Sequence, residues 1–279
     1  MAVFSPKETT DNYMNASVGK ATSSWWRLFV LGIAAGMLIG FGALVSSTAA
    51  HALTDAGMVR FVTGAIFPLG LMMVILLGTE LFTGNALMVT AAIDKRITWG
   101  QLGRNWIIVF IGNFVGAVAL AALMAFFGQF NIGAGALAVY TAKIAAAKAS
   151  LPWINAFVLG IFCNILVCIA VYIAGCAQDI AGKILGIFFP ICAFVTAGFE
   201  HCVANMYYIP AGIFAFLNPA YAGMIADAGI NTAVLEFGAF FVNNLIPVTL
   251  GNIVGGALVG IVMYYCHATR AKKQSGEAK

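Results

Sequence analysis

The chain has 279 residues, of which 62% are hydrophobic and 9% are charged, and its formal net charge is +4. Soluble domains contain about 45–50% apolar and about 25% charged residues, so this composition excludes an ordinary soluble protein and indicates that lipid is the main solvent. The net charge is too small to indicate a nucleic-acid partner. At this length we expect one membrane domain without a second sizeable soluble domain.

The two ends of the chain differ in composition from the part between them. Residues 1–24 are polar and contain no short apolar core with a cleavage site, so we expect no removable signal peptide there. We interpret them as a cytoplasmic segment, either a short amphipathic helix or disordered, with enough length to cover one end of the transmembrane domain. Residues 25–268 form the predicted transmembrane domain, and residues 269–279 form a predicted cytoplasmic tail.

Long apolar stretches divide the transmembrane domain. A helix that crosses the bilayer needs about 20 mostly apolar residues. The second and fifth stretches exceed that length, and polar residues interrupt each of them midway. We therefore predict an all-α fold with six transmembrane helices, of which helices two and five are broken. The stretches are 26–50, 60–93, 105–127, 153–176, 185–216 and 236–266.

The basic residues predict the orientation. An even number of spans puts both termini on one side, and most Lys and Arg then fall on that side, which by the positive-inside rule is the cytoplasm of the inner (plasma) membrane. The outer side holds Arg60, Lys143 and Lys148 alone. The inner side holds Lys7, Lys20, Arg27, Lys95, Arg96, Arg104, Lys183, Arg270, Lys272, Lys273 and Lys279.

Three short patterns recur in the same order in the two halves of the chain. Each half has three spans, an odd number, so the second half enters the membrane from the opposite side. Such inverted repeats are common in transport proteins, which place their site near the midplane where helices are interrupted. The patterns are Phe-Val-Leu-Gly-Ile at 29–33 and 157–161, Gly-x-Glu-x4-Asn at 78–85 and 198–205, and Gly-Asn-x-Val-Gly at 112–116 and 251–255.

Polar groups in the two breaks are the candidate functional residues, because charge and non-helical backbone at this depth must face protein or a cavity. Glu80 and Glu200 occupy matched positions, and we favour a structural role as acceptors for freed backbone N–H groups over a role as pore carboxylates. His201 has Leu81 as its counterpart, and a lone histidine at the midplane indicates a functional group. Thr83 offers a hydroxyl or a backbone N–H to the same point.

The cysteines give no sign of a cofactor. They lie mostly inside apolar runs and form no Cys-x-x-Cys pair, so we interpret them as small hydrophobic residues and expect neither a metal nor a redox site. They are Cys163, Cys168, Cys176, Cys192, Cys202 and Cys266.

Four motifs in these spans closely resemble the formate/nitrite transporter family over about residues 15–267. The resemblance implies an aquaporin-like fold, a homopentamer with one pore per protomer, a central hole that carries no substrate, and no enzymatic activity. The motifs are Leu-Phe-Thr-Gly at 81–84, Ile-Thr-Trp-Gly-Gln-Leu at 97–102 with Asn-Trp at 105–106, Gly-Phe-Glu-His at 198–201 through Asn-Met at 205–206, and Asn-Leu-Ile-Pro-Val-Thr-Leu-Gly-Asn at 244–252.

The resemblance also implies roles for individual residues. It places Thr83 and His201 together midway along the pore, between two apolar constrictions, with two asparagines flanking the path and a lysine giving positive potential at the outer mouth. The outer constriction is Phe67 and Phe194, and the inner one is Leu81, Phe82 and Val167. The asparagines are Asn164 and Asn205, and the lysine is Lys148.

The resemblance implies a small monovalent anion as substrate. Formate is favoured, because the nitrite branch more often carries tyrosine at the position of Phe199, while nitrite, hydrosulfide, acetate and lactate stay open. A bare charge in an apolar constriction is costly, so we expect permeation that depends on pH or is coupled to protons. Whether His201 donates the proton or stabilises the anion while solvent supplies it stays open.

Three other classes of protein are less consistent with the sequence. A haem-bearing redox subunit usually needs paired axial histidines, and His201 is the one histidine deep in a span. A scaffold without transport has no need of broken helices with polar residues at the midplane. A water channel uses paired Asn-Pro-Ala segments, and this tripeptide occurs once, at 218–220.

Overall fold

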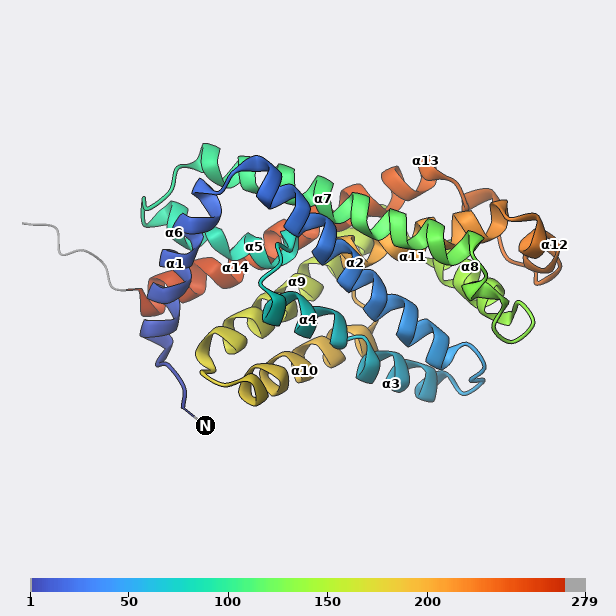
Figure 1. Ribbon diagram of the computed structural model, residues 1–279, viewed down its shortest axis with the longest axis horizontal. Coiled ribbons are helices and arrows are strands. Elements are labelled where there is room, and N and C mark those ends of the chain that lie inside the picture. The colour runs from blue at the N-terminus through green and yellow to red at the C-terminus, as the bar shows by residue number, and fades with distance from the viewer. Residues whose placement is uncertain (1, 269–279) are drawn as a thin grey trace, which may run out of the picture.

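The computed structural model describes residues 2–268, so the predicted tail at 269–279 lies outside the described residues. It shows an elongated, all-helical molecule with α1 and the end of α14 at one pole and α8 and α12 at the other (Figure 1). The principal helices are α1 (Pro6–Thr22), α2 (Trp25–Ala50), α3 (Ala56–Ile66), α4 (Leu69–Leu77), α5 (Phe82–Asn85), α6 (Val89–Ile93), α7 (Trp99–Phe126), α8 (Ala136–Ala149), α9 (Trp153–Cys176), α10 (Ile180–Ala197), α11 (Cys202–Leu217), α12 (Pro219–Asp227), α13 (Phe237–Ala239) and α14 (Ile246–His267). Short 3-10 turns lie at Ala86–Met88, Gln129–Asn131 and Thr232–Val234, and a π-helical segment, Phe240–Leu245, leads into α14.

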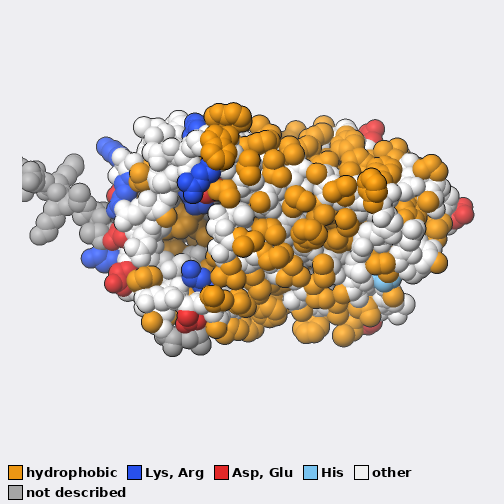
Figure 2. Space-filling view, in the orientation of Figure 1, with side chains coloured by type: hydrophobic (Ala, Val, Ile, Leu, Met, Phe, Trp, Pro, Cys, Tyr) orange, Lys and Arg blue, Asp and Glu red, His pale blue; other side chains and the backbone are white. Residues whose placement is uncertain are grey.

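The prediction of six apolar spans is confirmed. Within residues 2–268, six helices are long and apolar enough to cross a membrane, and Figure 2 shows hydrophobic side chains around the middle of the molecule with Lys and Arg gathered toward the α1 pole. Four of them agree with the predicted stretches within about six residues. The predicted second stretch divides into the span Ala56–Leu77 and a shorter apolar helical part, Phe82–Ile93. The predicted fifth stretch divides into α10 and α11, and α11 meets α12 at an angle of 101°.

The repeated sequence patterns mark two close helix pairs. α2 packs against α7 in the first half, and α9 packs against α14 in the second. A Cβ added at Gly116 would collide with the carbonyl of Ile33, and a Cβ added at Gly255 would collide with the carbonyl of Ile161. The Phe-Val-Leu-Gly-Ile segment of each half therefore packs against its Gly-Asn-x-Val-Gly segment, and glycine permits this approach of the backbones.

Two surface helices extend the repeat beyond the predicted spans. In α1, the Ser5 hydroxyl accepts a hydrogen bond from the N–H of Glu8, whose carboxylate in turn accepts from the N–H of Ser5, so a capping box fixes the helix start. Helix α8 is rich in alanine and packs mainly on α11. Each helix ends just before the first span of its half, so α1 and α8 occupy equivalent positions.

Candidate functional site at the two helix breaks

Two glycines end the first segments of the broken helices. Gly78 closes α4 with φ 65°, and Gly198 closes α10 with φ 78°, a left-handed conformation that glycine adopts without a steric penalty. The chain then runs extended until α5 and α11 begin. The breaks confirm the prediction for helices two and five and leave backbone groups that need new partners.

One asparagine in each half supplies those partners. The Asn113 Oδ1 accepts from the N–H of Phe82 at 2.9 Å, and its Nδ2 donates to the carbonyls of Gly32 at 2.8 Å and Glu80 at 2.9 Å. The second half repeats the arrangement: Asn252 accepts from Cys202 at 2.9 Å and donates to Gly160 at 2.8 Å and Glu200 at 3.0 Å. Each buried amide thus ties its break to the first helix of the same half.

The glutamates of the breaks form ion pairs with lysines. Glu200 accepts from the Lys148 ammonium at 2.7 Å and from the Asn205 amide at 2.7 Å. The first half repeats this: Glu80 accepts from Lys20 at 2.9 Å and from Asn85 at 2.7 Å. The expectation that these carboxylates accept from freed backbone N–H groups was wrong, because Asn113 and Asn252 meet that need.

Further asparagines close both networks. The Asn205 amide also donates to Asn244 at 2.7 Å, and Asn244 donates to the Lys148 carbonyl at 3.0 Å. Asn85 donates in the same way to Asn105 at 2.9 Å. The π-helical segment brings Asn244 to this position, which periodicity alone does not reveal.

Thr83 and His201 meet where the two breaks face each other. The Thr83 Oγ1 lies 2.9 Å from the His201 Nε2, and both side chains are buried. The His201 Nδ1 accepts from the N–H of Ala204 at 3.0 Å and so caps α11. A neutral imidazole with its Nδ1 as acceptor carries its proton on Nε2, so His201 donates to Thr83. The Thr83 hydroxyl proton has no further acceptor among residues 2–268 and is available to a ligand.

Apolar side chains enclose this pair. A cavity of about 10 Å³ lies beside His201. The rings of Phe67 and Phe194 meet edge to face across its outer end, with centroids 5.7 Å apart. Its lining consists of Ile39, Phe67, Leu71, Leu81, Val167, Ile191, Phe194 and His201. The structure therefore brings together the residues expected at both constrictions, except that the Phe82 ring packs against Trp106 and Phe110 of α7.

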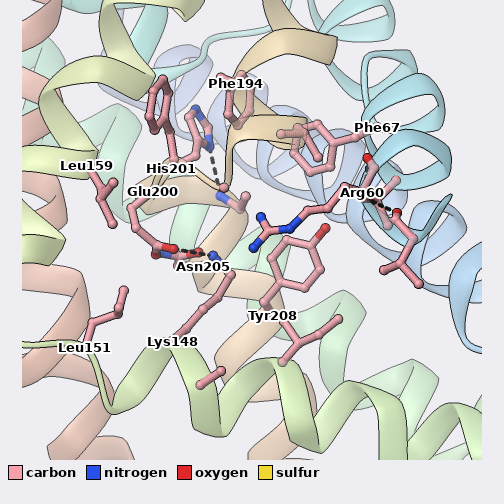
Figure 3. A pocket seen from close by; sticks show the side chains of 18 of the residues that line it. Arg60, Phe67, Lys148, Leu151, Leu159, Phe194, Glu200, His201, Asn205 and Tyr208 are labelled. Carbon is pink, nitrogen blue, oxygen red and sulfur yellow. Dashed lines mark hydrogen bonds and ion pairs between the residues drawn. The ribbon is translucent and has the colours of Figure 1, made fainter. Parts of the chain in front are cut away.

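A larger open cavity of about 400 Å³ adjoins the enclosed one. It shares Phe67, Phe194 and His201 with the enclosed cavity and reaches outward past Glu200 to Lys148. Figure 3 shows these side chains converging on one space from α3, α8, α10 and α11. The His201 ring is stacked near Phe194, with centroids 6.0 Å apart. The polar outer cavity thus leads to an apolar neck, which runs from the rings of Phe67 and Phe194 to Leu81 and Val167. His201 lies in this neck, just inside the two rings.

Two buried asparagines have unused acceptors. Asn164 donates to the carbonyls of Thr83 at 3.2 Å and Asn252 at 2.6 Å, and Asn205 donates to Glu200 and Asn244. The Oδ1 atoms of both Asn164 and Asn205 lack a hydrogen-bond partner in the described chain. A buried orphan acceptor is costly, so these atoms are suited to accept from water or a protonated ligand.

The fold and the site define a class: a multi-pass helical membrane protein with two repeated halves, whose broken helices meet at a buried Thr–His pair in a narrow apolar path. Comparison with known sequences specifies the family. The family model "Formate/nitrite transporter" matches residues 7–266, and the chain belongs to this family of channels and transporters, which are not enzymes.

Relatives and solved structures agree with this assignment. The chain is 40% identical to the formate channel FocA of Haemophilus influenzae over 95% of both chains. It is 42% identical to a probable formate transporter of Methanothermobacter thermautotrophicus over 94% of this chain and 96% of the relative. It resembles a solved pentameric formate channel with formate bound, with a TM-score of 0.75 and 35% identity over 86% of this chain and 96% of the other. Family membership excludes the redox subunit and the scaffold.

Removing one partner of the Lys148–Glu200 pair is expected to destabilise the protein. The Lys148→Met variant leaves the carboxylate buried without its cation, and the loss is expected to be roughly 2 kcal/mol, below the 3–5 kcal/mol of a fully buried pair because the lysine side chain keeps 19% exposure. Thermal unfolding in detergent measures the loss. The double variant Lys148→Met with Glu200→Gln should recover part of it, and a double variant no more stable than the single one would contradict a coupled pair.

Proposed function

We propose that this protein is a channel for small monovalent anions, with formate as its main substrate. The observation that carries the proposal is the Thr83–His201 pair, whose donor hydroxyl lies buried between apolar constrictions. A donor in an otherwise apolar neck lowers the energy of an anion there. The named relatives are a formate channel and a probable formate transporter, and the solved pentameric formate channel supports a pentamer. Because the Thr83–His201 pair and its apolar lining lie within one chain, we propose one pore in each protomer.

The path begins in the outer cavity and leads past Phe67 and Phe194, where the anion loses water. Beyond the rings it accepts a hydrogen bond from the Thr83 hydroxyl, which itself accepts from His201. Leu81 and Val167 line the path toward the cytoplasm. Because an isolated charge in this neck is costly, transfer of a proton to formate before or within it lowers the barrier.

Solvent, and not His201, is the proposed source of that proton. The His201 Nδ1 accepts from the N–H of Ala204, so a second proton on the ring would set two N–H groups against each other and break the cap of α11. The free Oδ1 atoms of Asn164 and Asn205 supply acceptors for the O–H of a protonated acid or for water beside the neck.

The N-terminal helix is proposed to cover the inner mouth. The Tyr13 hydroxyl of α1 donates to the carbonyl of Gly84 at 2.9 Å, directly behind Thr83, and Lys20 of the same helix pairs with Glu80. Both termini are proposed to lie in the cytoplasm of the inner membrane, since the described basic residues favour that pole (Figure 2).

Anion flux into proteoliposomes tests the function. Formate, nitrite and hydrosulfide are compared from about pH 8 to about pH 5. We expect formate to pass fastest. Its flux should rise on acidification, because a larger fraction of the formate is then protonated to the neutral acid. Faster nitrite or hydrosulfide flux would assign the protein to another substrate of the family, and no flux of any anion would contradict a channel.

A further inference from the structure

The side chain of Arg60 lines the outer cavity, and the path proposed above gives it no role. Arg60 lies on α3 and lines the 400 Å³ cavity together with Lys148 and His201. Figure 3 shows its head group directed into the space between Glu200 and Tyr208. In the sequence it is one of three basic residues predicted on the outer side, and no motif or spacing distinguishes it from the other two.

The two cations that line this cavity differ in their ion pairing. The Lys148 ammonium lies 2.7 Å from the Glu200 carboxylate, so its charge is largely offset at the mouth. Within residues 2–268, the Arg60 guanidinium forms no ion pair and no hydrogen bond. The Glu200 carboxylate thus offsets the charge of Lys148 and forms no ion pair with Arg60, so the positive potential expected from Lys148 comes chiefly from Arg60.

The backbone of the second break fixes where this charge lies. A Cβ added at Gly198 would collide with the Nη1 of Arg60, so the missing side chain leaves the room that the guanidinium fills. Gly198 stands three residues before His201, which places the cation at the entrance to the neck. Burial raises the pKa of the Tyr140 hydroxyl and Arg60 opposes that effect, as expected for a cation facing the same cavity.

A guanidinium recognises a particular shape of anion. Its parallel N–H groups match two oxygens held on one atom, as in a carboxylate, and bind them more specifically than an ammonium does. Formate and nitrite have such a pair of oxygens, whereas hydrosulfide has a single sulfur. We infer that Arg60 forms an outer binding site that captures planar two-oxygen anions before they enter the neck, an inference that rests on the proposed function.

The test compares saturation of flux in three variants. Arg60→Gln removes the charge. Arg60→Lys keeps the charge but lacks the two parallel N–H groups of the guanidinium, and Lys143→Gln is the matched control. Lys143 is a basic residue of α8 that lines a separate cavity beside Ser150 and Asn231. Formate and hydrosulfide uptake is measured over a range of concentrations at low and at physiological salt, and intact assembly is checked by size-exclusion chromatography.

We expect Arg60→Gln to raise the half-saturating formate concentration about tenfold, as loss of a charge-assisted pair does, with Arg60→Lys intermediate for formate. For hydrosulfide, Arg60→Lys should match the unmodified protein, and Lys143→Gln should match it for both anions. The difference caused by Arg60→Gln should shrink with salt. Equal half-saturating formate concentrations in Arg60→Gln and Lys143→Gln would overturn the inference about Arg60. The proposed function would still stand in that case, provided that the unmodified protein carries formate. If the unmodified protein carries no formate, the proposed function itself fails.

Discussion

Replacing His201 with asparagine is expected to reduce formate flux at least about tenfold while leaving the assembled protein intact. The Oδ1 of asparagine can accept from the N–H of Ala204 in place of the imidazole Nδ1 and so keep the cap of α11. The shorter side chain cannot reach the Thr83 hydroxyl, which in the structure lies 2.9 Å from the imidazole Nε2. Initial rates of formate uptake into proteoliposomes measure the loss.

The His201→Gln variant is the matched counterpart. Its amide can reach the Thr83 hydroxyl but caps α11 poorly, so we expect it to retain more flux than His201→Asn and to lose about 1 kcal/mol of stability. Because solvent supplies the proton in this mechanism, both variants should keep the pH dependence of the unmodified protein. Unchanged flux in His201→Asn would contradict a role for the Thr83–His201 hydrogen bond, and a flat pH profile would show that the histidine titrates.

Replacing Asn252 with leucine is expected to cost about 3 kcal/mol or more of stability, the largest loss we expect from a single change. The side chain makes three hydrogen bonds, to Cys202, Gly160 and the carbonyl of Glu200. Leucine has the same branching but leaves the N–H of Cys202 and the carbonyl of Glu200 buried without partners, at about 1–3 kcal/mol for each group, while the Gly160 carbonyl keeps the N–H of its own helix. Thermal unfolding in detergent, followed by loss of the assembled species, measures the effect.

The matched control for this change is Asn243→Leu in the π-helical segment that leads into α14. Asn243 makes one hydrogen bond, to the carbonyl of Ala149 at 3.2 Å, so its replacement should cost about 1 kcal/mol or less. The variant Asn113→Leu should behave like Asn252→Leu, because Asn113 makes the same three contacts in the first half. Equal stability of Asn252→Leu and Asn243→Leu would contradict the account of the second break.

The sequence predicts the spans and both breaks because each has a strong local signal. Hydropathy over about 20 residues locates the helices, and the Gly-x-Glu pattern locates Gly78 and Gly198, whose backbone is left-handed in the structure. The repeated Gly-Asn pairs also indicate a shared role for Asn113 and Asn252. The atoms they would bind are not evident, since these lie on other helices up to 92 residues away in the chain.

Pairings between distant residues account for what the sequence does not predict. Lys20 and Lys148 each lie five residues before a tryptophan that begins a span, and this spacing is the signal that could have identified α1 and α8 as equivalent. That Lys148 is offset by Glu200 while Arg60 is not becomes visible only in three dimensions. The Phe82 ring likewise packs against Trp106 and Phe110, an orientation that depends on tertiary contacts.

Formate uptake by the Thr83→Val variant tests the central claim most directly. Valine has nearly the shape of threonine and removes the hydroxyl alone, so the breaks, the ion pairs and the neck should stay as they are. If the anion passes between Thr83 and His201 and accepts from that hydroxyl, formate flux should fall at least about tenfold while the assembly and its melting temperature change little. Formate flux equal to that of the unmodified protein would contradict the claim that this pair is the point of passage.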